Sequence, residues 1–278
     1  VAIGYDTGKA VTTGIRNAIV GGDAGKALTT GSYNTVFGSH ALLAEDTGSA
    51  NTAIGYAALN ALNYDGTGYN VAVGHEAGAV MTTGIKNTII GSLAGDALTT
   101  GNYNVAVGYK ALSSEDGNGR NVAIGYTALD KLNAGADAYN VAIGFYAGKE
   151  VTSGIENTII GGQAGDALTT GARNVAIGHN ALSAEVTGGH NVAIGRNALN
   201  VLDAGADGHN VAIGSSAGES VSTGVENTII GFQAGVALTT GDNNIIIGND
   251  AAASAVGVDN EITLGDANIS AFRCADQS

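Results

Sequence analysis

The chain has no proline, no tryptophan, one methionine and one cysteine among its 278 residues. The lone thiol, Cys274, excludes a framework of intrachain disulfide bonds. Positive charge is also scarce, with 11 lysines and arginines against 25 aspartates and glutamates. The resulting net charge of −14 repels phosphate backbones, which argues against nucleic acid as a partner. No apolar run approaches the roughly 20 residues of a membrane-spanning helix, so we expect no membrane insertion.

Glycine and apolar side chains are abundant instead. Hydrophobic residues make up 44% of the chain, which argues against an intrinsically disordered polypeptide. The 45 glycines do not follow the strict triplet of collagen. The chain begins at Val1 inside a repeat, and we therefore expect it to be a piece of a longer polypeptide.

A short phrase recurs along the whole chain. Each copy starts with Asn, continues with three mostly apolar residues and ends on Gly, as in NVAIG and NTIIG; only the last copy, NEITLG, is longer. The spacing between copies is 17, as from Asn17 to Asn34, with a spacing of 19 at every fourth step and 16 at the end. The asparagines are Asn17, Asn34, Asn51, Asn70, Asn87, Asn104, Asn121, Asn140, Asn157, Asn174, Asn191, Asn210, Asn227, Asn244 and Asn260. Val1 to Gly4 is the end of a further copy, which makes about sixteen units.

Four units form a larger repeat with a period of 70, as from Asn17 to Asn87, whose fourth unit carries an insertion such as NYDGTG, NAGADA or DAGADG. A unit of this length is too short for a pair of helices, which needs more than about thirty residues. It fits one coil of a parallel β-solenoid, with Val and Ile in a first strand, the AG-x-A-L-T-T segment in a second, and glycines at the bends. The two extra residues should bulge from a turn and leave the strands in register.

Helix is the competing interpretation for the runs ALNALN, ALDKLN and ALNVLD, which contain good helix formers. Each run is short and lies between glycines, and short isolated helices are marginal. We interpret these runs as strand or turn. The sequence thus predicts an all-β solenoid shaft over residues 1–259 and a terminating or neck segment over residues 260–278.

The alternation of side chains along a strand places Asn, the middle residue and Gly of each phrase on one face, and the Val and Ile flanks on the other. We expect the Asn face to point inward, where the amides can bond the turn backbone. The Val and Ile flanks would then form an apolar stripe along the whole rod, larger than a soluble monomer usually exposes. Copies of the same chain should cover the stripe, and two-fold, three-fold or higher symmetry would all do so.

The NVAIG phrase with its closing glycine resembles the left-handed parallel β-roll of trimeric autotransporter adhesin heads, which repeat a similar phrase over shorter coils. The longer phrase NTxxGxxAGxxLTTG more closely resembles repeat shafts of bacteriophage tail fibres. The stretch NEITLGDANISAFRC (residues 260–274) is similar to the segment that precedes the endosialidase-type intramolecular chaperone of many such fibres. These resemblances imply a left-handed coil and a parallel homotrimer, with a chaperone cleaved off or omitted after Ser278. Cys274 would then lie near the three-fold axis as a buried thiol.

The sequence offers little catalytic chemistry, since neither a GxSxG motif nor a phosphate-binding loop is present. Glu45, Glu115 and Glu185 recur with the period of the larger repeat, and carboxylates on stacked coils can pair for glycoside hydrolysis. We favour instead a solvated turn that keeps the rod soluble. No enzymatic activity, catalytic residue or cofactor is predicted.

A metal site is not predicted either. Asp65, Asp137 and Asp207 lie in the inserted loops, but one carboxylate per loop is too few for calcium, which takes about six to eight oxygens. Turn formation accounts for them. The histidines show no ligand spacing; they are His40, His75, His179, His190 and His209.

Eight of the ten tyrosines fall into two columns of the repeat. Tyr33, Tyr69, Tyr103 and Tyr139 precede the Asn, and Tyr5, Tyr56, Tyr109 and Tyr126 follow the Gly. Rings with basic neighbours can stack on sugars, and the candidate glycan contacts are Tyr33, Tyr69, Tyr103, Tyr139, Arg120 and Arg173. We favour the alternative that the rings cover the rim of an apolar interface and keep their hydroxyls in water.

These observations favour a structural, non-enzymatic shaft or adhesion segment of a trimeric tail fibre or a fibre-like surface appendage. Its expected place is the virion or an extracellular surface, and its expected partners are further copies of itself, other virion or fibre proteins and a cell-surface glycan or other host receptor. Two alternatives stay open: a bacterial trimeric adhesin head, and a polysaccharide depolymerase acting in a groove between chains.

Overall fold

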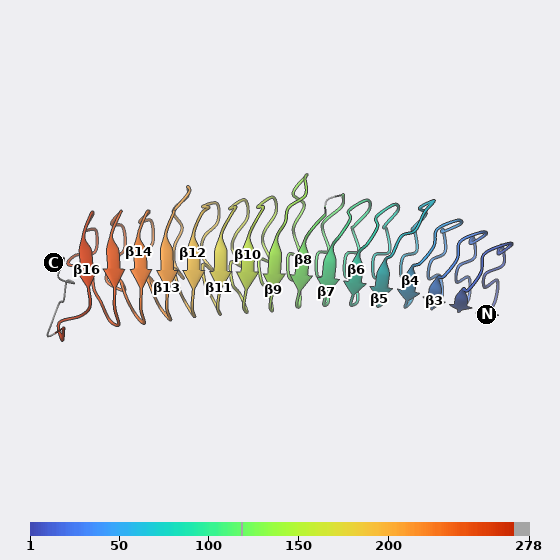
Figure 1. Cartoon of the computed structure of the whole chain (residues 1–278), viewed down its shortest axis with the longest axis horizontal. Coiled ribbons are helices and arrows are strands. Elements are labelled where there is room, and N and C mark those ends of the chain that lie inside the picture. Colours follow the sequence, from blue (N-terminus) through green and yellow to red (C-terminus); the bar gives the residue numbers. More distant parts are fainter. Residues whose placement is uncertain (118, 270–278) are drawn as a thin grey trace, which may run out of the picture.

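The computed structural model describes residues 1–117 and 119–269. Within these residues, sixteen short parallel strands form one sheet in which every strand pairs with its neighbours in sequence (Figure 1). The strands are β1 (Ala2–Ile3), β2 (Ala18–Val20), β3 (Thr35–Phe37), β4 (Thr52–Ile54), β5 (Val71–Val73), β6 (Thr88–Ile90), β7 (Val105–Val107), β8 (Val122–Ile124), β9 (Val141–Ile143), β10 (Thr158–Ile160), β11 (Val175–Ile177), β12 (Val192–Ile194), β13 (Val211–Ile213), β14 (Thr228–Ile230), β15 (Ile245–Ile247) and β16 (Ile262–Leu264). The coils stack into a rod with β1 at one end and β16 at the other. The described residues contain no α-helix, and so none that is long and apolar enough to cross a bilayer.

The strand register follows the sequence period. Most paired residues are 17 apart, as in Thr158 opposite Val175. At the coils with insertions they are 19 apart, as in Val122 opposite Val141, and the strand pairs remain aligned. The predicted parallel β-solenoid is therefore confirmed, and the extra residues leave the sheet undisturbed. The handedness of the coil and the association of three chains stay predictions.

The predicted second strand in each coil is wrong, because the AG-x-A-L-T-T segment folds as consecutive turns. In the coil of β10, Gln163 and Gly165 have φ angles of 56° and 50°, in the left-handed region, and two such residues so close together prevent an extended backbone. Turn hydrogen bonds follow, with the Leu168 amide donating to the Gly165 carbonyl at 3.2 Å. The ALNALN run is also turn, which agrees with one of the two expected conformations.

Several leucines adopt the left-handed conformation at the position where other coils have glycine. The φ angles of Leu59, Leu129 and Leu199 are 50°, 50° and 47°. Such a backbone costs an ordinary residue about 1–2 kcal/mol. All three side chains are completely buried, and burial of a leucine contributes about 1.5–3 kcal/mol. Packing therefore offsets the backbone strain. The helix and strand propensities of a residue do not include this packing energy.

The interior is filled by matching large and small residues between the strand and the turns. In most coils whose middle strand residue is isoleucine, as at Ile159, the left-handed turn position is glycine, here Gly165. Where the middle residue is alanine, as at Ala193, that position is often leucine, here Leu199. A Cβ on Gly165 would lie 2.9 Å from Cδ1 of Leu168 and 3.4 Å from Cδ1 of Ile159, so these two side chains already fill the space beside the glycine. Most coils thus carry one large side chain at this pair of positions, from the strand or from the turn, although the coil of Ala142 and Gly148 has neither.

The strand asparagines form a ladder through the core. From Asn17 to Asn244 each side-chain Oδ1 accepts the backbone N–H of the corresponding residue one coil later, at 2.9–3.2 Å. In most coils the Nδ2 group donates to the carbonyl 14 residues later, as from Asn157 to Gly171 at 2.9 Å. Asn17 is partly exposed and the remaining members are buried. The ladder therefore satisfies backbone groups that would otherwise be unpaired in the interior.

The predicted ladder ends at Asn244, and Asn260 does not extend it. Glu261 takes the next place and donates its backbone N–H to Oδ1 of Asn244 at 2.9 Å. The spacing therefore stays at 17, and β16, inside the predicted terminating segment, pairs in register with β15. Cys274 lies outside the described residues.

Replacement of one ladder amide should destabilise the rod locally. In Asn140→Ala the Asn157 N–H and the Gly154 carbonyl lose their partners, at roughly 1–3 kcal/mol for each buried group. We expect the free energy of unfolding, measured with urea, to fall by about 2–4 kcal/mol. Asn133→Ala is the matched control, because Asn133 is an exposed asparagine in the preceding loop and should change stability by less than about 0.5 kcal/mol. Equal losses in both variants would contradict the ladder's role.

A second pair of variants tests the matching of large and small residues. Ile159→Ala should leave a cavity and lower stability by about 2–5 kcal/mol. Adding Gly165→Leu recreates the trio of Ala193, Leu199 and Leu202 and should recover part of that loss, even though Gly165→Leu alone overpacks the coil. A thermodynamic cycle measured by urea unfolding should show a favourable coupling of about 0.5–3 kcal/mol. Strictly additive effects would refute the packing argument.

Candidate functional site

The residue directly before each ladder residue forms a column along one edge of the rod, which we name the edge column. Its members are Arg16, Tyr33, Ala50, Tyr69, Lys86, Tyr103, Arg120, Tyr139, Glu156, Arg173, His190, His209, Glu226, Asn243 and Asn260. All have φ between 49° and 62°, which turns the chain from the preceding bend into the strand. All are exposed except Ala50 and His190, which are half-buried. The fold thus displays one side chain per coil, with neighbours spaced by roughly the 4.8 Å between strands.

The edge column brings three of the six candidate glycan contacts together. The Arg120 guanidinium carbon lies 5.5 Å from the ring centroid of Tyr103 and 5.6 Å from that of Tyr139, on the two adjacent coils. Arg120 also forms an ion pair with Asp137 of the inserted loop. The rings of Tyr103 and Tyr139 are about half exposed. This cation–π cluster offers aromatic surface with a fixed positive charge between the rings.

The other three candidate contacts lie apart on the same edge. Tyr33 pairs with Arg16, whose guanidinium donates to the tyrosine hydroxyl at 2.5 Å. Tyr69 is an exposed ring two coils before Tyr103. Arg173 donates to Glu156 at 2.7 Å. The six candidates therefore belong to one column but do not converge on a single pocket.

The second tyrosine column stacks over longer stretches. Tyr109 lies 5.3 Å from Tyr126, and Tyr126 lies 5.4 Å from Phe145, with ring planes within about 20° of parallel. Tyr146 packs against Phe145 at 3.9 Å. Phe145 follows the Gly in the same position of the repeat and belongs to this column, although the sequence prediction includes only the tyrosines.

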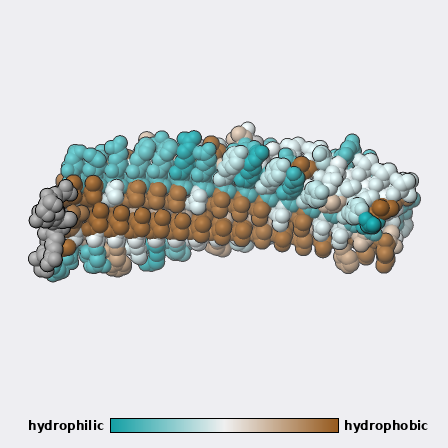
Figure 2. All heavy atoms as spheres, viewed as in Figure 1, coloured by the Kyte–Doolittle hydropathy of each residue, from teal (hydrophilic) through white to brown (hydrophobic). Residues whose placement is uncertain are grey.

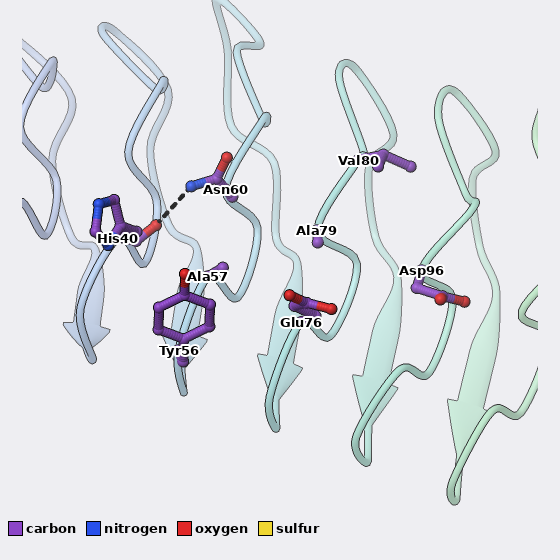
Figure 3. Close-up of a pocket in the computed structure, with 8 residues that line it drawn as sticks. All are labelled: His40, Tyr56, Ala57, Asn60, Glu76, Ala79, Val80 and Asp96. Atoms are coloured by element: carbon purple, nitrogen blue, oxygen red, sulfur yellow. Dashed lines mark hydrogen bonds between the residues drawn. The ribbon is translucent and has the colours of Figure 1, made fainter.

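An open groove of about 440 Å³ lies beside Tyr56. Figure 3 shows side chains from successive coils along it, among them His40, Tyr56, Glu76 and Asp96. The Asn60 amide donates to the His40 carbonyl at 3.0 Å and links two of the coils. Partial burial raises the pKa of Asp96 above its ordinary value, and the neighbouring Glu76 charge adds to the rise. The groove is thus lined by one tyrosine ring and two carboxylates.

The outer face of the sheet is apolar along the rod. Figure 2 shows a brown band of apolar residues running the length of the molecule. The band contains the residues that flank the buried middle residue of each strand, including Ile213, Ile245 and Ile247, which are 37–38% exposed. Val and Ile thus face outward as the sequence predicts, and the Asn face points inward.

The expectation that Glu45, Glu115 and Glu185 sit on solvated turns is wrong, because all three are completely buried. Oε1 of Glu185 accepts the Gly188 N–H at 2.7 Å, and Oε2 accepts the Ala204 N–H at 3.2 Å. Glu45 bonds the Gly48 and Tyr64 amides in the same way. These two carboxyls therefore tie the closing bend of one coil to the inserted loop of the next. The burial of all three also removes them as carboxylates that a polysaccharide could reach.

His190 and His209, which the sequence leaves scattered, lie together in the third block, by which we mean the third copy of the 70-residue repeat. One ligand atom each of His190, Asp207 and His209 lies within 4.8 Å of the others. One coil with its insertion separates His190 from His209, so their rings stack at 5.0 Å. The signal that would have found them is their shared position in the repeat: residues one period apart become neighbours in a solenoid.

The buried glutamates make stability depend on pH. Burial raises the pKa of Glu185 above the ordinary value of glutamate, although the N–H groups that donate to it oppose the rise. The folded chain therefore holds this proton to a higher pH than the unfolded chain. The resulting stabilisation is complete at low pH and is lost as the pH rises through the raised pKa.

We expect Glu185→Gln to reveal this dependence. As the pH rises from about 4 to 7, the Tm of the unsubstituted chain should fall relative to that of the variant, because glutamine cannot ionise. Differential scanning calorimetry across this range measures the difference. Glu226→Gln, at an exposed position, is the control and should show little change. A difference between Glu185→Gln and the unsubstituted chain that stays constant with pH would contradict the argument.

No family model, no curated protein and no solved structure matches the chain. Its candidate functions therefore rest on exposed features of the rod: the edge column, the groove beside Tyr56 and the apolar band on the sheet.

Proposed function

We propose that the chain is a structural, non-enzymatic shaft segment, three parallel copies of which associate in a tail fibre of a virion or in a similar extracellular appendage. It spaces and displays surfaces that contact a host. The observation that carries the proposal is the continuous apolar band on the outer face of the sheet.

The apolar band needs a cover in water, because soluble monomers rarely expose continuous apolar surface over such a length. A second copy of the same chain is the occupant we favour. Every coil adds one strand at the same spacing, so an identical parallel rod presents matching Val and Ile side chains at each step. An unrelated globular partner would match this repeat over a few coils only. Closed three-fold association covers the bands of all copies.

The backbone supports a mechanical role. Hydrogen bonds join each coil to the next through the strands, the turns and the asparagine ladder. Sixteen strands at about 4.8 Å make a rod roughly 70 Å long. Because each coil contacts mainly its neighbours, the rod is stiff along one axis and its length scales with the number of coils.

Display is the second part of the proposed role. The edge column repeats aromatic and basic side chains along the rod, and the Tyr103–Arg120–Tyr139 cluster has the aromatic faces that stack on sugar rings. Association of several copies multiplies weak contacts into useful avidity. A host-cell glycan is therefore the receptor class that we favour, and a bacterial adhesin head would use the same features.

The solution mass tests the assembly. Native mass spectrometry should give three times the chain mass of 27.3 kDa. Ile213→Glu combined with Ile177→Glu places two charges per chain in the covered band and should yield monomers with unchanged circular dichroism. Gln233→Glu, an exposed substitution of the same charge outside the band, should leave the trimer intact. A monodisperse monomer of the unsubstituted chain would overturn the proposal.

A further inference from the structure

A cluster of metal-ligating side chains lies on the edge of the third block, between the coils of β12 and β13. His190 and His209 are consecutive members of the edge column, and Asp207 belongs to the inserted loop between them. The two imidazole rings are stacked, with centroids 5.0 Å apart and planes 12° from parallel. Nε2 of His190 lies 3.7 Å from Oδ2 of Asp207. All three groups offer a ligand atom within 4.8 Å of the others.

The backbone holds these residues in place before any ligand arrives. The His190 amide donates to the Ala172 carbonyl at 3.1 Å, and the Gly208 amide, between the other two residues, donates to Gly189 at 2.9 Å. Gly189 leaves room for the aspartate, because a Cβ there would lie 2.7 Å from Oδ1 of Asp207. The cluster is therefore built on hydrogen-bonded coils, and only side-chain rotation is needed to close it.

The geometry suits one small transition-metal ion. Ligand atoms about 2.0–2.1 Å from a tetrahedral zinc lie about 3.3 Å from one another. The 3.7 Å separation of His190 and Asp207 is close to that value, and the 4.8 Å limit is within reach of small χ rotations. Two imidazoles and one carboxylate favour Zn²⁺ and similar borderline ions over calcium or magnesium, which prefer oxygen ligands. The acidic chain, with its net charge of −14, also attracts cations.

Comparison of the three blocks supports a cation at this place. The positions of His190, Asp207 and His209 hold Arg120, Asp137 and Tyr139 one block earlier. There the arginine itself pairs with the aspartate and lies against the tyrosine ring.

In the first block the same positions hold Ala50, Thr67 and Tyr69, so the cationic side chain and the carboxylate are both absent. This loop position thus holds an aspartate in the two blocks in which either an arginine or two histidines lie beside it. In the third block two histidines take the places of the arginine and the tyrosine.

We propose that His190, Asp207 and His209 bind one divalent transition-metal ion of the zinc class, with water completing its coordination. The ion fastens the inserted loop of one coil to the closing bend of the coil before it. In the third block the ion holds the inserted loop in place, as the Arg120–Asp137 ion pair does in the second block.

Isothermal titration of the untagged full chain with Zn²⁺ alone tests the proposal, with inductively coupled plasma mass spectrometry to count the bound metal. We expect one ion per chain and a rise in Tm on binding. The variant His190→Arg with His209→Tyr copies the residues of the preceding block and should therefore fold normally. Its affinity should fall by more than about a hundredfold, beyond the roughly 10–100-fold loss caused by removing an outer partner of a ligand.

The preceding block allows a converse experiment. Arg120→His with Tyr139→His places two imidazoles beside Asp137 and should create a second site, so that two ions bind per chain. His75→Ala is the control for non-specific binding by an exposed histidine and should leave the stoichiometry at one. Equal Zn²⁺ affinity in the unsubstituted chain and the His190→Arg, His209→Tyr variant would overturn the proposal. So would a stoichiometry that stays at one after Arg120→His and Tyr139→His.

Discussion

The asparagine ladder is the interaction on which the rest of the molecule depends. Each side-chain amide accepts a backbone N–H from the following coil and, in most coils, also donates to a carbonyl in the bend that closes its own coil. One side chain therefore sets both the rise from one coil to the next and the closure of its own coil. The ladder asparagines are buried except at Asn17, so bulk water does not reach the groups that they bond. Because the amide satisfies them, the wall opposite the strand is free to be a run of turns. The regular spacing of the edge column and of the apolar band follows from that fixed rise.

The period and the β-branched residues were enough to predict a parallel solenoid, its inward asparagine face and the register across the insertions. Thr52 pairs with Val71, across a coil with two extra residues, because the insertion stays in the loop. The turns were not predictable from propensity. Leu59 and Leu129 adopt a conformation that leucine rarely takes, and only the packing of neighbouring coils offsets its cost. A strand was the natural inference from residue types, and it failed because that packing is not visible in a single coil.

The candidate sites, like the fold, were predictable in part. The sequence was enough to recognise the residues of one column as a set. It did not predict that Asp137 contacts Arg120 or that Asp207 approaches His190, because the loop conformation decides which side chains meet. The burial of Glu185 was missed for a related reason. Its place in the coil is filled by Leu168 one coil earlier and by Leu202 one coil later, which marks the position as interior. Comparison of equivalent positions between coils is therefore more informative than the chemistry of any residue by itself.

The repetition of one register has a consequence for how such a rod changes over generations. Each block of four coils begins and ends on strands with the same pairing geometry, as Val71 and Val141 illustrate. Recombination between near-identical coding segments can therefore delete or duplicate a whole block and leave every remaining coil with a compatible neighbour. Such exchange would alter the reach of the rod in fixed increments of four coils, while selection acts separately on the few side chains that distinguish one block from another.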